Sequence, residues 1–166
     1  MKKLFKLIGL TFVTICFSAS VLGQGVSATA NASAVIISPI AITKTTDLSF
    51  GNLAVGAGGG SLILSTASGR TPTGDVSYQA APAATAAAFD VTGSAGLTYT
   101  ITLPASATIT SGANTMTINT FVSNPVSPAT LAAGSNTLLV GATLVVGAAQ
   151  PTGTYTGTFD VTVGYN

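Results

Sequence analysis

The chain carries very little ionisable chemistry. Only 5% of its 166 residues are charged, and histidine and tryptophan are absent. Its acidic residues are four aspartates, Asp47, Asp75, Asp90 and Asp160, and its one cysteine is Cys16. General acid–base catalysis draws on histidines or paired carboxylates, and metal centres need clustered ligands. These absences argue against an enzyme, a cofactor-binding protein and a metalloprotein, and a single cysteine excludes an internal disulfide.

Most of the positive charge is at the start of the chain. Three lysines within the first six residues precede an apolar run from Leu7 to Phe17, and small residues from Ser18 to Gly23 follow. This order is typical of an export signal, and the apolar run is too short to span a membrane. We predict that residues 1–23 are removed, with cleavage after Ala30 as the alternative. The protein is then expected in the periplasm, on the cell surface or outside the cell.

The charge balance changes once that segment is removed. Two basic residues, Lys44 and Arg70, remain against four aspartates, a net charge of −2. A chain so poor in lysine and arginine has no electrostatic surface for nucleic acid or anionic lipid. No second long apolar run follows, so we expect no membrane span in the mature chain. Its length of about 143 residues suits one domain.

The remaining sequence is rich in threonine, alanine, serine and glycine. Branched residues recur in short alternating runs between turn signals, which predicts an all-β fold. The longest alternation runs from Gly153 to Tyr165, with threonines on one face. The other face carries Tyr155, Phe159, Val161, Val163 and Tyr165. Such a period of two predicts a continuous, half-buried strand.

The other runs define the rest of the predicted domain. We predict nine strands, at residues 47–55, 61–66, 75–79, 89–92, 97–103, 107–111, 115–121, 136–146 and 153–165. Residues 56–60 and 67–74, which are rich in glycine or contain proline, are expected to be loops, and so are residues 80–88. Residues 89–92 and 97–103 are expected to form a hairpin, as are 107–111 and 115–121. The expected core residues are Phe50, Phe89, Ile101, Leu139, Phe159 and Val161.

A weaker alternation precedes this domain. Polar residues separate the small apolar residues Val26, Ala28, Ala30, Ala32 and Ala34. We interpret residues 24–34 as an extended arm or a first strand. A more apolar continuation over residues 35–42 contains Pro39 and suits an edge strand. The predicted fold of residues 35–166 is a single immunoglobulin-like or pilin-like antiparallel β-sandwich without substantial helix.

Several motifs in this domain occur together in one order. They are Asp47-Leu48-x-Phe50-Gly51, Gly58-Gly59-Gly60, Phe89-x-Val91-Thr92-Gly93, Tyr99-x-Ile101-x-Leu103-Pro104, Asn114-Thr115-Met116 and Gly153-Thr154-Tyr155-x-Gly157-x-Phe159-x-Val161-x-Val163-x-Tyr165. This set resembles a family of small secreted bacterial domains known only as a domain of unknown function. The resemblance covers nearly all of residues 34–166. It implies an exported β-sandwich and brings no catalytic residues.

The C-terminal run carries a second resemblance. Tyr165 is penultimate, and Gly153 is fourteenth from the end when Asn166 is counted first. This arrangement resembles the last strand of chaperone–usher pilin subunits, and residues 26–34 lie where such subunits carry a strand for their neighbour. The resemblance implies self-association, or binding of a periplasmic chaperone, through sheet edges. A complete sandwich whose first and last strands pair internally is the alternative.

Two functions follow as expectations. The first is a non-enzymatic structural or adhesive protein of the bacterial envelope, in the form of a pilus-type subunit assembled by strand complementation. Its candidate assembly residues are Val26, Ala28, Ala30, Ala32, Ala34, Gly153, Tyr155, Phe159, Val161, Val163 and Tyr165. The alternative is a monomeric secreted module that binds a glycan or small ligand, with Tyr78, Tyr99 or Tyr155 stacking on a sugar ring.

Overall fold

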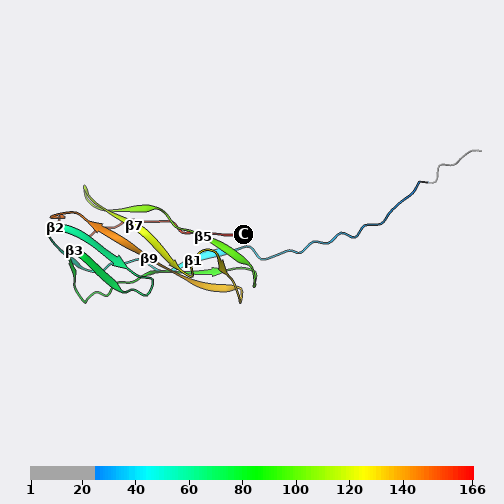
Figure 1. Ribbon diagram of the computed structural model, residues 1–166, viewed down its shortest axis with the longest axis horizontal. Helices are drawn as coiled ribbons and strands as arrows, with labels where there is room; N and C mark the ends of the chain where they lie inside the picture. The colour runs from blue at the N-terminus through cyan, green and yellow to red at the C-terminus, as the bar shows by residue number, and fades with distance from the viewer. Residues whose placement is uncertain (1–24) are drawn as a thin grey trace, which may run out of the picture. The chain divides into compact units, whose positions relative to one another are not determined.

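The computed structural model describes residues 25–166, so the predicted export signal lies outside the described residues. Residues 36–166 form one compact unit. Residues 25–35 have no secondary structure and are all exposed, as an extended chain (Figure 1). Residues 25–34 thus form no strand among the described residues. No helix that could cross a membrane is found among residues 25–166.

The compact unit is all-β, as predicted, with ten strands in two antiparallel sheets. The strands are β1 (Ala41–Thr46), β2 (Leu53–Leu64), β3 (Arg70–Tyr78), β4 (Ala87–Thr92), β5 (Thr98–Thr102), β6 (Ser106–Ser111), β7 (Asn114–Asn124), β8 (Ala129–Thr130), β9 (Ser135–Val146) and β10 (Thr162–Tyr165). The described part of the chain contains no helix. The predicted sandwich of about nine strands is confirmed.

Strand β9 is the centre of the large sheet (Figure 1). Its first half, residues 135–140, pairs with β4, and its second half, residues 142–146, pairs with β2. Strand β7 pairs with its other side, and β1, β3 and β6 form the outer strands. Every second residue of β9 from Leu138 to Val146 is buried, and residues 138–146 contain leucine, valine, alanine, threonine and glycine only.

The small sheet, in the order β10–β5–β8, covers one half of the large sheet. Together they enclose a core that we call the closed half. Its buried residues are Ala87, Val91, Tyr99, Ile101, Ala129, Leu131, Leu138 and Val140. Both sheets contribute to this core, which is the arrangement expected of a sandwich.

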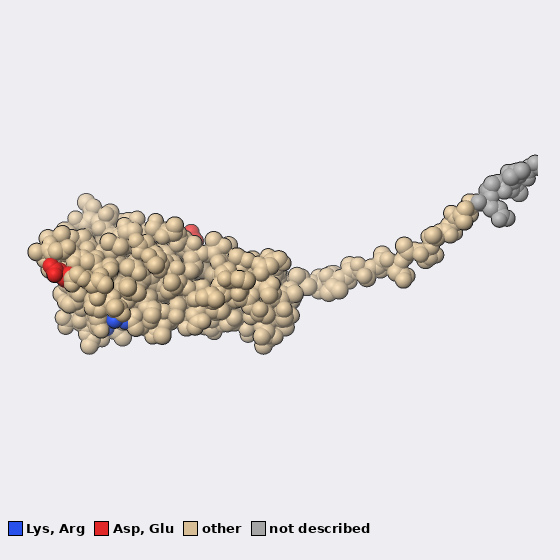
Figure 2. Space-filling model, in the orientation of Figure 1, with Lys and Arg blue, Asp and Glu red and all other residues tan. Residues whose placement is uncertain are grey.

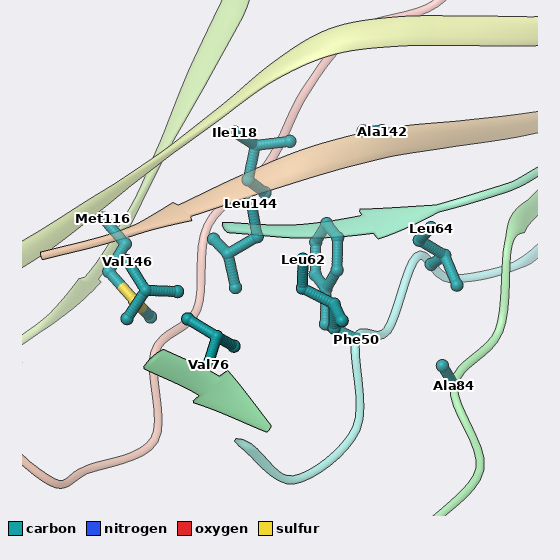
Figure 3. Packing of buried hydrophobic residues seen from close by; sticks show 10 residues of the cluster. All are labelled: Phe50, Leu62, Leu64, Val76, Ala84, Met116, Ile118, Ala142, Leu144 and Val146. Atoms are coloured by element: carbon teal, nitrogen blue, oxygen red, sulfur yellow. The ribbon is translucent and has the colours of Figure 1, made fainter. Parts of the chain in front are cut away.

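The other end of the large sheet has a separate core, which we call the open half. Its buried residues are Phe50, Leu62, Leu64, Val76, Ala84, Met116, Ile118, Ala142, Leu144 and Val146 (Figure 3). They come from β2, β3, β7, β9 and two connecting segments, and none comes from the small sheet. The open half is therefore covered by irregular chain where the closed half is covered by strands.

The predicted loop over residues 56–60 is wrong, and that over residues 67–74 is correct only up to Gly69, because β3 begins at Arg70. Residues 56–60 lie within β2, where the pairing with β3 shifts register between Val55 and Gly60. The Gly58 N–H donates to the Asp75 carboxylate at 2.8 Å, which holds this bulge against β3. Pro72 lies within β3, and an edge strand tolerates proline because one side of it needs no donor.

The hairpin predicted between residues 89–92 and 97–103 is also wrong. Strand β4 belongs to the large sheet and β5 to the small sheet, so the chain crosses from one sheet to the other. Two alternating runs separated by a short glycine-containing loop fit either connection, because alternation does not identify the pairing partner. The second predicted hairpin is confirmed as β6–β7.

The first strands begin later than predicted. Residues 35–40 are in no strand, and β1 begins at Ala41. The predicted strand over residues 47–55 is interrupted, because Ser49 forms only an isolated bridge to Thr85 and Gly51 has a φ of 73°. A positive φ of this kind favours glycine and turns the chain before β2.

The predicted core is only partly correct. Phe50 and Ile101 are buried, whereas Phe89, Leu139, Phe159 and Val161 are half-buried. Phe89 and Phe159 line the same cleft, described below, so each has one side without a neighbour. Phe89 and Phe159 are therefore only half-buried because they line this cleft.

Candidate functional site

The C-terminal run forms two short pairings in place of one long strand. Thr156 forms an isolated bridge to Thr110 of β6, and residues 162–165 form β10 on β5. Within the described chain, no strand pairs with residues 157–161. The predicted continuous strand is therefore wrong at its centre, where the chain leaves the large sheet and joins the small one.

The predicted alternation of faces in this run is confirmed. Phe159, Val161, Val163 and Tyr165 pack against the core of the closed half, and Tyr155 packs against that of the open half. Asp160 between them is exposed. The chain keeps the alternation of an extended segment although it lacks a partner along part of its length.

Gly157 explains how this run lies so close to β6. A side chain at this position would collide with the backbone carbonyl of Thr108 and would lie 3.1 Å from the Ile109 Cα atom. Only glycine permits such an approach. Residues 153–157 thus lie directly beside the outer edge of β6, and they form a wall beside the open half.

This C-terminal wall, residues 153–159, is hydrogen-bonded on one side. Thr156 donates its N–H to the Thr110 carbonyl at 3.0 Å and accepts the Thr110 N–H at 2.9 Å. In an antiparallel pair of this type, the backbone groups of the adjacent residues point the opposite way. Those of Tyr155 and Gly157 therefore point away from β6, and both residues line the cleft beside this wall.

The N-terminal wall, residues 44–50, has the same property. It continues β1, which is an edge strand paired only with β4. Ser49 exchanges two backbone hydrogen bonds with Thr85, both 2.9 Å long. The N–H and C=O of Leu48 therefore point to the other side, and Leu48 also lines the cleft.

A cleft of about 860 Å³ lies between the two walls. Its floor is apolar and consists of Phe50, Ile109, Met116, Ile118, Leu144 and Val146. Figure 3 shows five of these six side chains grouped in the core of the open half. Met116 and Phe50, at 9% and 8%, are the most exposed buried residues of that core. The cleft therefore borders the core of the open half.

Polar groups also line the cleft. Lys44 and Asp47 form an exposed ion pair of 2.6 Å on the N-terminal wall. The Tyr155 hydroxyl donates to the Pro151 carbonyl at 2.8 Å and accepts from the Gln150 amide at 2.9 Å. No group of histidine, cysteine or acidic side chains that could hold a metal occurs in residues 25–166. The cleft thus offers backbone hydrogen bonds at both edges and apolar contacts in between.

The candidate assembly residues of the C-terminal run separate into two groups. Gly153, Tyr155 and Phe159 line the cleft, whereas Val161, Val163 and Tyr165 do not. The candidate residues of the arm, Val26 to Ala34, are exposed. Sequence reasoning missed the floor residues of β6, β7 and β9. Their alternation was visible, but it did not indicate that their inner face would lack a covering strand.

The three tyrosines considered for sugar stacking do not share a site. Tyr99 is fully buried and is therefore wrong as a stacking residue. Tyr78 lies under the Arg70 guanidinium, 3.9 Å from it, outside the cleft. Only Tyr155 lines the cleft. The three tyrosines therefore form no common stacking surface among the described residues.

Comparison with known families adds one match. The model of a family described as a domain of unknown function (DUF4402) matches residues 40–165. No curated protein and no solved structure matches the chain. The matched region begins one residue before β1 and ends at the last residue of β10, so it contains both walls and the floor of the cleft. The chain belongs to this DUF4402 family of domains of unknown function.

Proposed function

We propose that this domain is a structural subunit of the bacterial envelope that is completed by one β-strand from another polypeptide. The observation that carries the proposal is the pair of walls, in which Ser49 and Thr156 bond to neighbours outside the cleft while the backbone groups of Leu48, Tyr155 and Gly157 point the other way, beside an apolar floor. An inserted extended chain would satisfy the free backbone groups of both walls and would place alternate side chains on the floor. This is β-strand addition, in which backbone hydrogen bonds supply affinity and side-chain pockets supply specificity.

The arm of a second copy is the occupant that the chain itself supplies. Residues 26–36 place an apolar residue at every second position, from Val26 through the alanines to Ile36. Eleven extended residues span about 36 Å. Val26 and Ile36 are 101% and 98% exposed, so the single chain leaves this apolar face without cover. The arm also carries no charged residue (Figure 2), which suits a cleft with an uncharged floor.

The small side chains of the arm also suit the walls. The C-terminal wall has glycines at 153 and 157, and the floor already contains large side chains such as Phe50 and Met116. Alanines facing that floor would lie close to it without displacing those side chains. Each backbone hydrogen bond gained contributes about 1 kcal/mol net. Several such bonds together with apolar contacts are sufficient for stable association.

A direct test places charge on the two faces of the arm in turn. The variant Ala30→Asp with Ala32→Asp puts two carboxylates on the face predicted to enter the cleft, where they would have no partner. The control variant Thr29→Asp with Asn31→Asp puts the same charge on the opposite face. Light scattering after size-exclusion chromatography should show association of the wild type and of the control, and loss of association in the inward variant.

Other outcomes would point to other partners. A wild type that is monomeric at every concentration and melts cooperatively would contradict self-association. A periplasmic chaperone that lends a strand to the same cleft is a second source of the inserted strand, and its binding would be unaffected by the inward variant.

Binding of a glycan or small ligand is a second candidate function. It is favoured by the cleft volume of about 860 Å³, within the range usual for such ligands. Among the described residues, four aromatic side chains line the cleft, those of Phe50, Phe89, Tyr155 and Phe159. A ligand bound here should compete with a synthetic peptide of residues 26–36. A glycan array measured with the inward variant, whose own arm is excluded from the cleft, separates the two functions.

Export is part of the proposal. Residues 1–23 have the order of charge, apolar run and small residues that an export signal requires. N-terminal sequencing of exported protein should begin at Gln24, which leaves the arm complete. A first residue of Asn31 would remove most of the arm and would contradict its role as donor.

A further inference from the structure

The hydroxyl of Tyr165 joins three distant parts of the compact unit. It accepts the Ser94 backbone N–H at 2.6 Å and donates to the Ser38 carbonyl at 2.9 Å. The Ser38 N–H in turn donates to the Ser94 Oγ at 2.8 Å. We call this closed set of three hydrogen bonds, made by Ser38, Ser94 and Tyr165, the terminal clasp.

The terminal clasp lies at the root of the arm. Ile36 and Ile37 just before it are exposed, at 98% and 49%. Ser38 is the first of the described residues for which a hydrogen bond is observed. Ile40, two residues later, already packs against the core of the closed half. The arm therefore meets the fold at Ser38.

Only a tyrosine serves this geometry. A phenolic hydroxyl donates one hydrogen bond and accepts others, so one atom can hold both Ser38 and Ser94. Gly93 makes room for it, because a Cβ atom at that position would overlap the Tyr165 hydroxyl. Asn166 holds the end of β10 in place, since its N–H donates to the Thr98 carbonyl at 3.3 Å and its side-chain amide to the Thr98 hydroxyl at 3.2 Å.

We propose that Tyr165 is a positioning residue that holds the root of the arm at a set point on the closed half. Ser38 does not line the cleft, so the clasp and the cleft are separate sites on the domain. The consequence for assembly rests on the proposed function. An arm of residues 26–36 bound in the cleft of a neighbouring copy would then join the two domains through residue 37 alone, with a defined spacing.

The test compares two tyrosine-to-phenylalanine variants of the full chain by amide hydrogen exchange. Tyr165→Phe removes the clasp hydroxyl, whereas the control Tyr155→Phe removes a hydroxyl that is hydrogen-bonded in the open half. We expect the Ser38 and Ser94 amides to exchange roughly tenfold faster in Tyr165→Phe, the effect of losing one hydrogen bond. They should be unchanged in Tyr155→Phe. An unchanged Ser38 rate in Tyr165→Phe would overturn the proposal.

A second variant covers the case in which Tyr165→Phe does not fold. Ser94→Ala keeps the tyrosine but removes the acceptor of the Ser38 N–H, and it should raise the Ser38 exchange rate by a similar factor. An unchanged rate would contradict the clasp.

Light scattering separates this proposal from the assembly function. If Ser38 exchanges faster in Tyr165→Phe but the wild type never associates, the clasp is supported and the assembly function is contradicted. If the wild type associates but Ser38 exchange is unchanged in Tyr165→Phe, the assembly function is supported and the clasp is contradicted.

Discussion

The closed and open halves have equally apolar cores but unequal cover. In the closed half, both sheets face the core, and Tyr99, Leu131 and Leu138 are 0% exposed. In the open half, one sheet faces irregular chain; Leu62 and Leu64 are also 0% exposed, and Met116 and Phe50, at 9% and 8%, line the cleft. The open half therefore has a cleft where the closed half has a second sheet. This difference locates the proposed function.

The edges of the two halves differ in the same way. In the closed half, β10 and β8 flank β5 and complete a second sheet. In the open half, the backbone groups of Leu48, Tyr155 and Gly157 point away from their hydrogen-bonded neighbours, beside the apolar floor of the cleft. Exposed strand edges invite pairing with another chain, and proteins usually block them with charge, proline or a covering segment. Among residues 25–166, the cleft lining contains one charged pair, Lys44 and Asp47, and it lies on one wall.

The largest expected loss of stability is in the closed half. Leu138→Ala removes a fully buried side chain of β9 that faces the small sheet. The surrounding strands are paired and cannot collapse into the space, so we expect a loss of about 4 kcal/mol in the free energy of unfolding. Urea denaturation measures it. A loss under about 1 kcal/mol would mean that the closed half is not tightly packed.

A matched truncation in the open half should cost less. Met116→Ala removes a floor residue that lacks neighbours on the side of the cleft. We expect a loss of about 2 kcal/mol, at the low end for such truncations. The loss should increase when a peptide of residues 26–36 is bound, because the peptide would cover Met116. An equal loss with and without peptide would place the peptide elsewhere.

Alkaline pH should weaken the closed half through Tyr99. Burial raises the pKa of Tyr99, and the nearby Asn136 side chain lowers it by less. Its hydroxyl has no hydrogen-bond partner of acceptable geometry among residues 25–166. The unfolded chain therefore ionises first, so this contribution to stability is complete below the ordinary tyrosine pKa of about 10 and is lost as pH rises through the folded value.

The measurement is denaturation near neutral pH and one unit above that ordinary pKa. Tyr99→Phe should lose less stability between the two conditions than the wild type. The control Tyr78→Phe changes a tyrosine that is 40% exposed and should behave as the wild type. Equal alkaline sensitivity in all three proteins would contradict the burial argument.

The smallest expected effect is at the rim of the cleft. Lys44→Ala breaks an ion pair whose side chains are 57% and 79% exposed. Solvent and salt screen such pairs, so the stability should change by less than about 0.5 kcal/mol. Thermal melting at low and high salt measures this change. A larger, salt-dependent loss would give the N-terminal wall an electrostatic role.

Sequence patterns predicted those parts of the fold that depend on local alternation. Strand β9 was predicted correctly because its apolar run is long, and the β6–β7 hairpin because a short turn joins its two alternating strands. The bulge at residues 56–60 could not be predicted, since glycines signal both loops and bulges. The change of sheet after Gly157 was also missed, because an alternating run does not reveal where its partner ends.

Of the candidate site, the sequence predicted only the N-terminal arm and the C-terminal run. The arm and the C-terminal run were identified by their alternation and by a resemblance, and Gly153, Tyr155 and Phe159 do line the cleft. Leu48, Ile109 and Met116 were not identified, because the sequence of a floor is the same whether or not a strand covers it. The absence of a covering strand is a property of topology, which emerges only when all strands are placed.

Amide hydrogen exchange on addition of the arm peptide tests the central claim most directly. The full chain with Ala30→Asp and Ala32→Asp, whose own arm is excluded, is mixed with a synthetic peptide of residues 26–36. New protection should appear at Leu48, Tyr155 and Gly157, whose backbone groups point away from the outer strands. Ser49 and Thr156, already bonded to Thr85 and Thr110, should change little. A peptide that does not bind, or that binds without protecting both walls, would contradict the account.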